Sequence, residues 1–394
     1  MQKKSITDIN VNNKTVLLRV DFNIPLETGT STEPIYDHRI RSALPTIYYL
    51  LGSNAKIILC SHLGRPDGTN VKNLKLEPVA QQLEKLLLMP IKYVNDCVGP
   101  TVEKAINELN PKEILLLENL RFHEGEELNS EKFAMNLSKL ADVFIMDAFG
   151  VAHRKHASTA KIHKLLPSAA GFLLEREIKL LEDGLKTPTP PFGAILGGAK
   201  IDDKIKVIRS LLPKIDKLLV GGEMAKEFIK YTINNNLPKT DLGREIASII
   251  ELTKKLNVEL ILPEDVVVTE KFGEESKHSL NVDINNIPNG WAIMDIGQKT
   301  IEKFKKELKK CKTIVWNGPM GVFEIEAFKE GTRNIAQLLS TNNGTTIVGG
   351  GSTAEAVEKL GYVDRMTHVS TGGGACLQLL QGNELPGISA LPNK

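Results

Sequence analysis

The sequence predicts an α/β protein made of two doubly wound, Rossmann-like parallel-sheet domains joined by a connecting helix. Three observations lead to this fold class. The chain has 394 residues, which is too long for one ordinary domain. Short runs rich in Val, Ile and Leu alternate with amphipathic stretches along its length. A proline-rich segment divides this alternation into two series, so we expect a bilobal molecule with a hinge cleft.

The first series predicts five buried strands. They lie at residues 15–20, 56–60, 91–94, 114–117 and 143–146, with helical patterns between them such as 39–51 and 77–88. Strands that are almost continuously apolar are typical of a parallel sheet covered by helices on both faces. This series predicts an N-terminal domain over residues 1–169.

The second series predicts a C-terminal domain over residues 187–385. Its strands are expected at 193–196, 217–220, 260–262, 292–295, 313–316, 345–348 and 368–370. The helical stretch at 170–186 precedes the sequence TPTPP (Thr187 to Pro191), which cannot join either sheet. We interpret residues 170–186 as the interdomain helix.

Composition excludes several classes of protein. The 50 basic and 48 acidic residues leave a formal net charge of +2, so no global charge favours nucleic acid or a membrane surface. The four cysteines, Cys60, Cys97, Cys311 and Cys376, form no CxxC pair and indicate reduced thiols. No stretch reaches the roughly 18 apolar residues of a membrane span. We expect a cytoplasmic protein.

Polar groups gather after the strands of the first series, where ligands bind in open α/β sheets. A single arginine in such a place is more often an ordinary solvated residue, but several at strand exits favour an anion site. The set is expected to bind a phosphorylated carboxylate. It comprises Asp21, Asn23, His62, Arg65, Arg121 and Arg154, together with Arg39 at the start of a helix.

Glycine runs take the corresponding places in the second series. Glycine between a strand and a helix lets backbone N–H groups approach a phosphate closely. Five such runs predict a polyphosphate ligand, although neither a Walker A loop nor a GxGxxG motif is present. The runs are Gly197–Gly198, Gly221–Gly222, Gly318 with Gly321, Gly349–Gly351 and Gly372–Gly374.

Three histidines could chelate a metal ion. His153, His156 and His163 have no acidic or cysteine partner in register, so we favour a structural or substrate-side role for them.

Seven motifs together resemble those of the phosphoglycerate kinase family, in that family's order and over almost the whole chain. The resemblance implies reversible phosphoryl transfer between ATP and the carboxylate of 3-phosphoglycerate, giving ADP and 1,3-bisphosphoglycerate. It also implies that Mg²⁺ arrives with the nucleotide and that residues 386–394 pack back on the N-terminal domain. We further expect a monomer. The motifs are RVDFNIP, SHLGRP, LLENLRFHEGE, DAFGVAHR, LGGAKIDDKI, WNGPMGVFE and STGGGA.

Matching these motifs residue by residue implies three sets of site residues. The substrate set is Asp21, Asn23, Arg39, His62, Leu63, Gly64, Arg65, Arg121 and Arg154. The nucleotide set is Lys204, Ile293, Gly318, Glu324, Gly350, Gly351, Ser352 and Thr353, with Glu324 on the ribose. The catalytic set is Arg39, Lys200, Gly373 and Gly374.

Two positions depart from the family's pattern. Ile293 stands where the family often has glycine, and Ser352 stands where it has an aspartate associated with magnesium. The sequence from Ser352 to Glu355 reads as an S-x-x-E capping box, so we favour a helix cap over metal coordination by Ser352. No protein ligand of the metal is therefore certain, and Ser352 is one candidate.

The expected chemistry needs no general base, because the acceptor is a carboxylate that is already ionised at neutral pH. Arg39 and Lys200 would clamp the moving phosphoryl group when the lobes close. Two other classes stay open. A catalytically silent nucleotide-binding scaffold would be favoured by loss of Arg39 or Lys200, and an NAD-dependent oxidoreductase would need the missing GxGxxG.

Overall fold

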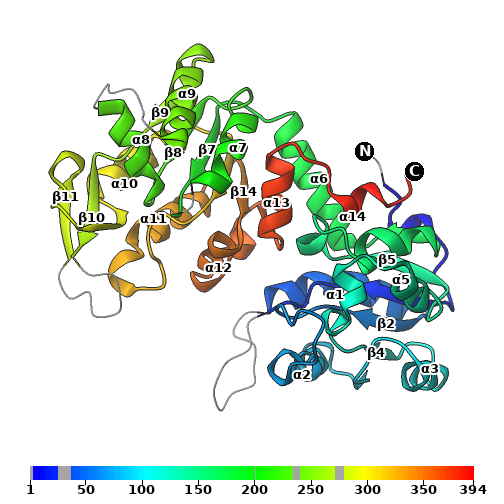
Figure 1. The fold of residues 1–394 in the computed structure, drawn as a ribbon. Helices are drawn as coiled ribbons and strands as arrows, with labels where there is room; N and C mark the ends of the chain where they lie inside the picture. The colour runs from blue at the N-terminus through cyan, green and yellow to red at the C-terminus, as the bar shows by residue number, and fades with distance from the viewer. Residues whose placement is uncertain (1–2, 25–36, 200, 234–239, 271–278) are drawn as a thin grey trace. The chain divides into compact units, whose positions relative to one another are not determined.

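The computed structural model describes residues 3–24, 37–199, 201–233, 240–270 and 279–394. The chain divides into two compact units. The first unit comprises Met1–Lys179 together with Glu384–Lys394, and the second comprises Leu180–Asn383. Each unit is built on its own six-stranded sheet (Figure 1).

The sheet of the first unit is parallel throughout, with the strand order β3-β4-β2-β1-β5-β6. Strands β2, β3 and β4 lie on one side of β1, and strands β5 and β6 lie on the other. The switch point of the sheet therefore lies between β1 and β5. The strands are β1 (Thr15–Arg19), β2 (Lys56–Cys60), β3 (Ile91–Tyr93), β4 (Ile114–Leu116), β5 (Val143–Met146) and β6 (Ser168–Ala170). The helices are α1 (His38–Gly52), α2 (Glu77–Leu87), α3 (Pro100–Asn107), α4 (Glu124–Glu127) and α5 (Glu131–Ser138), with short turns η1 (Ile6–Asp8), η2 (Lys72–Leu74), η3 (Leu120–Phe122), η4 (Phe149–Val151), η5 (Ala157–Lys161) and η6 (Ile162–Lys164).

The core of this unit explains the apolar strand pattern. The apolar stripes of α1 and α2 pack on one face of the sheet, where Ile47 and Leu83 are fully buried with Leu18 and Leu59. Burying each such side chain contributes about 1.5–3 kcal/mol relative to exposure. The ends of the strands are thereby held in fixed positions.

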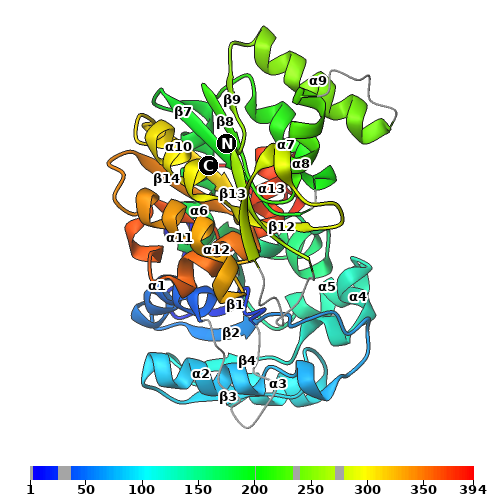
Figure 2. The same ribbon diagram turned by 90° about the vertical axis from the view of Figure 1, so that its left-hand side faces the viewer.

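The second unit repeats this design with the order β15-β14-β13-β7-β8-β9, again parallel. Helices α10, α11 and α12 cover one face, and α7 and α13 lie on the other (Figure 2). The strands are β7 (Phe192–Leu196), β8 (Lys217–Val220), β9 (Glu259–Ile261), β13 (Thr313–Asn317), β14 (Thr345–Gly349) and β15 (His368–Val369). The helices are α7 (Asp202–Leu211), α8 (Met224–Ile233), α9 (Asp241–Lys255), α10 (Gln298–Leu308), α11 (Glu330–Leu339), α12 (Gly351–Lys359) and α13 (Gly373–Leu380), with turns η7 (Ile284–Asn286), η8 (Glu326–Phe328) and η9 (Val363–Arg365).

Two parallel α/β sheets confirm the predicted fold class, but one predicted strand belongs elsewhere. The strand predicted at 292–295 is β12 (Ala292–Ile296), and it lies in a separate antiparallel sheet, not in the parallel one. This small sheet has the order β11-β10-β12, with β10 (Asp265–Thr269) and β11 (Ser279–Asp283). β12 is almost as apolar as a parallel strand because its Ile293 joins a local cluster with Val266 and Val268.

The segment between the two sheets begins later than the sequence predicts. Ala170 ends strand β6, which pairs with β5, and helix α6 runs over Phe172–Lys186. The residues of β6 are small, so they gave no strand signal in the sequence. The division between the units falls inside α6, after Lys179.

The end of the chain lies on the first unit. The N–H of Lys4 donates to Pro392 O at 3.0 Å, and that of Gly387 donates to Ala152 O at 2.8 Å. Lys394 Nζ lies 2.9 Å from Asp8 Oδ2, and the short helix α14 spans Pro386–Ser389. Among the described residues, no helix has the length and apolar character needed to cross a membrane.

Candidate functional site

The carboxyl ends of β1, β2, β4 and β5 converge on one edge of the first unit. Backbone bonds join the segments that follow the strands: Leu120 N–H donates to Ser61 O at 3.0 Å, and Asp147 N–H donates to Arg19 O at 2.8 Å. The Ser61 hydroxyl also accepts from Phe22 N at 2.9 Å. Polar side chains from distant parts of the sequence therefore meet here. We call this set of strand exits the cationic edge.

A chain of hydrogen bonds connects five of the predicted substrate residues. Arg39 Nη1 donates to Asp21 Oδ2 at 3.1 Å and to Asn23 O at 3.0 Å. Asn23 Oδ1 accepts from Gly64 N at 2.9 Å, and Arg121 Nη1 donates to Gly64 O at 2.7 Å. Helix α1 thus supplies Arg39 to the exit of β1, Gly64 follows β2, and η3 supplies Arg121 from the exit of β4.

His62 lies at the centre of this edge and is buried. Its Nδ1 is 3.3 Å from Arg19 Nη2 and 3.8 Å from Asp21 Oδ1. A guanidinium can only donate hydrogen bonds, so Nδ1 is the acceptor and the proton of the neutral ring sits on Nε2. Burial, reinforced by the charges of Arg19 and Arg121, lowers the pKa of His62 well below its ordinary value.

Two further histidines lie close to the same arginines. Burial lowers the pKa of His156 to about 3, with Arg121, Arg19 and Arg154 lowering it further. Burial and Arg154 likewise lower the pKa of His153. Like charges disfavour a protonated imidazole, so the arginines add to the effect of burial. Arg65 and Arg154 add their charges to those of the ion-paired Arg39 and Arg121, so this edge is suited to an anion.

The other predicted substrate residues occupy the surface and the floor of the edge. Arg65 and Arg154 are exposed, and Arg154 lies within electrostatic reach of Arg121. Leu63 is buried, and its N–H donates to Asn119 Oδ1 at 3.2 Å. It contributes backbone and packing to the edge.

Sequence reasoning missed the residues that support this edge from behind. Arg19 is fully buried in β1, donates to the Ser158 hydroxyl at 2.9 Å, and also bonds Val20 O. Ser158 in turn donates to Glu126 Oε1 at 2.6 Å, which compensates the buried charge. The available signal was an arginine inside the apolar run of a strand, which predicts a buried and fully bonded guanidinium.

In the second unit, glycine turns meet one another at the carboxyl ends of β7, β13, β14 and β15. Gly318 has φ +97°, and a side chain there would overlap the carbonyl of Gly197. A side chain on Gly373 would overlap the N–H of Gly351, so the first turns of α12 and α13 touch. Only glycine permits these contacts. We call this group of turns the glycine edge.

A threonine and an asparagine underlie the glycine edge. The Thr353 hydroxyl accepts from Gly318 N at 2.7 Å and ties β13 to helix α12. Asn317 is fully buried, and its amide nitrogen and oxygen have no hydrogen-bond partner among the described residues. Unsatisfied buried amides are costly, so the Asn317 side chain is suited to a ligand bound at this edge. The sequence pattern gave no sign of its role.

The capping role predicted for Ser352 is wrong. Helix α12 begins at Gly351 with Gly350 as its N-cap, which places Ser352 in the first turn with an exposed side chain. Glu355 pairs with Lys359 at 2.8 Å instead of reaching back to a cap. The positive φ of Gly350, +95°, moves the start of the helix ahead of the serine.

The remaining nucleotide residues lie on other elements of the second unit. Lys204 is half-buried in α7, and Glu324 is exposed between β13 and η8. Ile293 is buried in β12, where its side chain packs into the local cluster of the small sheet. Gly374 follows Gly373 in the first turn of α13. Lys200 lies outside the described residues.

The fold and the two edges define a class of protein. Two α/β units, one with a cluster of arginines and one with converging glycine turns, are the arrangement of enzymes that act on phosphorylated ligands.

Comparison with known proteins gives the family. The family model of phosphoglycerate kinase matches residues 6–383. The chain is 50% identical to the phosphoglycerate kinase of Moorella thermoacetica and 47% identical to that of Dictyoglomus turgidum, each over the full length of both chains. It is also similar to solved phosphoglycerate kinase structures from Coxiella burnetii (37% identity, TM-score 0.83) and Pyrococcus horikoshii (33%, 0.86), covering 98% of each chain. The chain belongs to the phosphoglycerate kinase family.

Proposed function

We propose that the chain is a phosphoglycerate kinase, which transfers a phosphoryl group reversibly between ATP and the carboxylate of 3-phosphoglycerate. The proposal rests on one observation, which is that the two units present different binding groups. The first presents a set of arginines around three histidines whose pKa values are lowered by burial and further by these cations. The second presents converging glycine turns over an asparagine that lacks a hydrogen-bond partner among the described residues. One edge fits a small phosphorylated acid and the other a polyphosphate.

On the substrate side, different residues are proposed to bind the phosphate and to orient the rest of the acid. Arg65, Arg121 and Arg154, with His62, are proposed to bind the phosphate, since planar guanidinium groups match its oxygens. Asp21 and Asn23 orient the acid and position Arg39, which each of them already contacts. His62 is neutral in the ligand-free protein, because its burial and the surrounding arginines lower its pKa, and it is proposed to donate through Nε2.

On the nucleotide side, the glycine edge is proposed to hold the phosphates. Gly318, Gly350 and Gly351 offer backbone N–H groups or space for close approach, and Thr353 keeps their turns together. The Asn317 amide would gain the partner it lacks. Lys204 is proposed to meet the phosphates, Ile293 the adenine and Glu324 the ribose.

The transfer step depends on charge neutralisation and orientation. The carboxylate of the acid is ionised at neutral pH and attacks the terminal phosphorus of ATP directly. Arg39 from the first unit and Lys200 from the second stabilise the charge on the moving phosphoryl group. The N–H groups of Gly373 and Gly374, at the start of α13, add hydrogen bonds. These groups serve both directions of the reaction.

The residues present fit a magnesium ion carried by the nucleotide. The exposed hydroxyl of Ser352 in the first turn of α12 would hold the ion together with phosphate oxygens and water. When bound, Mg²⁺ supplies neutralisation of the phosphate charge.

The proposed working form is a monomer in the cytoplasm whose partners are ATP or ADP and the two phosphoglycerates. The balanced charge of the chain, +2 overall, supports an enzyme of small molecules over a nucleic-acid or membrane protein.

A coupled assay tests the proposal. The protein is mixed with Mg-ATP and 3-phosphoglycerate, and 1,3-bisphosphoglycerate is detected by NADH oxidation with glyceraldehyde-3-phosphate dehydrogenase. We expect turnover that requires all components and disappears when glycerate replaces 3-phosphoglycerate. Nucleotide binding without turnover would favour a silent scaffold, and NADH oxidation without the coupling enzyme would favour an oxidoreductase.

A further inference from the structure

A cysteine, a histidine and an aspartate meet in the first unit beyond the substrate residues. Asp96 and Cys97 follow strand β3, and His123 follows η3 at the exit of β4. One potential ligand atom from each residue lies within 4.8 Å of the other two, and this is the one such group among the residues that the structure describes. We infer that Asp96, Cys97 and His123 form a binding site for Zn²⁺ or a similar transition-metal ion, with water as the fourth ligand.

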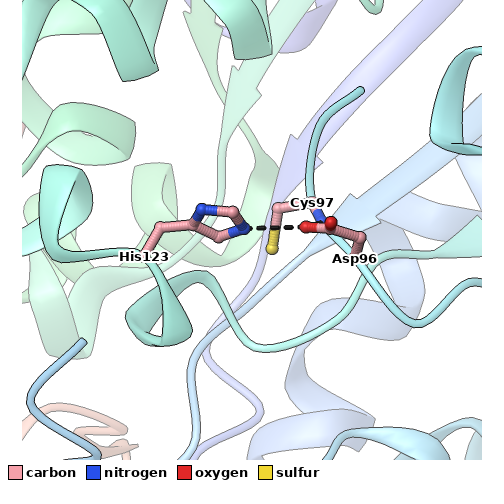
Figure 3. Close-up of side chains that lie close together, drawn as sticks. All are labelled: Asp96, Cys97 and His123. Carbon is pink, nitrogen blue, oxygen red and sulfur yellow. Dashed lines mark hydrogen bonds and ion pairs between the residues drawn. The ribbon is translucent and has the colours of Figure 1, made fainter. Parts of the chain in front are cut away.

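The positions of the three ligand atoms are close to those of a tetrahedral site. His123 Nε2 lies 2.7 Å from Asp96 Oδ1, and Figure 3 shows the ring nitrogen facing the carboxylate with the Cys97 sulfur beside them. Bonds of about 2.0–2.3 Å at tetrahedral angles require ligand atoms about 3.3–3.7 Å apart. The His123–Asp96 pair would open by about 1 Å at most, and the sulfur, which lies within 4.8 Å of the other two ligand atoms, would need to approach by about 1.5 Å at most.

The surroundings hold each ligand in place. Cys97 Sγ donates to Glu118 O at 3.0 Å, and Cys97 N donates to Asp96 Oδ1 at 2.6 Å. The His123 ring stacks on Phe133, with centroids 5.0 Å apart and an interplanar angle of 26°. Such contacts fix the orientation of metal ligands and strengthen binding.

The donor set selects the class of metal. A thiolate and an imidazole favour a borderline-soft ion such as Zn²⁺ or Co²⁺, whereas Mg²⁺ prefers oxygen ligands. Cys97 is fully buried, but the side chains of His123 and Asp96 are 32% and 47% exposed, so an ion can reach the site and keep one water.

The binding step is a simple exchange of a proton for a metal. In the metal-free protein, Cys97 is a thiol whose Sγ donates to Glu118 O at 3.0 Å. A hydrated Zn²⁺ ion loses water ligands and forms bonds to the Cys97 sulfur, to Asp96 Oδ1 and to His123 Nε2. The thiol proton passes to solvent, and the proton that His123 Nε2 now donates to Asp96 leaves that nitrogen while Nδ1 takes one up, so the ring stays neutral. Neither an oxidant nor a reductant takes part.

The ion would connect two segments that follow neighbouring strands. The segment after β3 carries Asp96 and Cys97, and the segment after β4 carries His123 only two positions beyond Arg121. Metal binding would therefore stabilise the first unit. The inference depends on these contacts alone and does not rest on the proposed kinase activity.

Titration with Co²⁺ tests the site. Co²⁺ is added to the full chain after treatment with EDTA, and absorbance is followed in the near ultraviolet and the visible. We expect a thiolate-to-cobalt charge-transfer band with the strong visible bands of tetrahedral Co²⁺, and we expect Zn²⁺ but not Mg²⁺ to abolish both. A titration without the charge-transfer band would overturn the inference.

Two variants and a control locate the binding. Cys97→Ser and His123→Gln should each weaken Co²⁺ binding by at least about 100-fold. Cys311→Ser should leave the spectrum unchanged, because Cys311 is an equally buried free thiol in the second unit. Zn²⁺ should raise the midpoint of thermal unfolding of the parent chain and of Cys311→Ser, but not of His123→Gln. If His123→Gln keeps the parent spectrum and affinity, the metal is held elsewhere and the assignment is wrong, even if Cys97→Ser does not fold.

Discussion

Replacing Thr353 by valine tests whether the glycine edge is held together as the structure indicates. Valine has nearly the shape of threonine but lacks the oxygen that accepts the Gly318 N–H at 2.7 Å. Thr353 is fully buried, so the N–H would lose its partner without gaining water. The cost of such an unsatisfied buried group is about 1–3 kcal/mol.

This cost appears in two measurements on the Thr353→Val variant. With a change of about 2–4 °C per kcal/mol for a unit of this size, Tm should fall by about 2–12 °C. The turn at Gly318 should also shift, so calorimetric titration should show weaker binding of Mg-ADP by about 10-fold or more. Thr353→Ser keeps the oxygen and should retain most of the affinity.

The affinity for the phosphoglycerate substrate serves as the internal control, since its proposed ligands lie in the other unit. It should be the same in the parent chain and in both variants. A Thr353→Val protein with parental Tm and parental Mg-ADP affinity would refute the role given to the Thr353–Gly318 bond. Equal losses in the valine and serine variants would attribute the effect to packing instead.

Three further outcomes follow from the same structure. Ser352→Asp should tighten the binding of Mg-ADP by about 1 kcal/mol or more in calorimetry, because a carboxylate is a better magnesium ligand and is favourable in the first turn of a helix. Equal or weaker binding would mean that this position does not face the metal. Burial raises the pKa of Asp147 to about 7, above its unfolded value of about 4. The contribution of this carboxyl to the free energy of unfolding is therefore complete below pH 4 and is lost as the pH rises to 7. Asp147→Asn should therefore flatten the fall in stability over this range in urea titrations, and an unchanged slope would contradict the protonated carboxyl. Small-angle scattering should show a smaller radius of gyration with both substrates present than with either alone, and identical values in all states would exclude closure.

The sequence was sufficient for the parallel sheets because periodicity and burial agree there. Runs such as Lys56–Cys60 and Thr313–Asn317 are apolar over most of their length and became central strands. It was insufficient where a strand is small or lies outside the main sheet. Ser168–Ala170 carries almost no β propensity, and Ala292–Ile296 has the composition of a parallel strand but pairs antiparallel.

Prediction from the sequence was limited in the same way for single residues of the site. Residues that follow strands, such as Asp21 and Gly318, could be found because topology alone brings strand exits to one edge. Asn317 and Asp96 could not be found, since their surroundings depend on three-dimensional contacts with the glycine turns and with His123. The apolar run around Arg19 indicates a buried guanidinium, but its bond to Ser158 also depends on the fold. Ser352 was misplaced because the positive φ of a neighbouring glycine, which sets the start of α12, cannot be read from a capping pattern.

The central claim is that the cations of the first unit stabilise a phosphoryl group in transfer to 3-phosphoglycerate. The most direct test follows the reaction by ³¹P NMR with Mg-ATP and 3-phosphoglycerate, for the parent chain and for Arg39→Ala. The parent should form ADP and an acyl phosphate. Arg39→Ala should lower kcat by at least about 100-fold, whereas KM for the acid substrate should change less, because the charge of Arg39 acts on the transition state. No acyl phosphate from the parent chain, or a variant with unchanged kcat and a raised KM, would contradict this account.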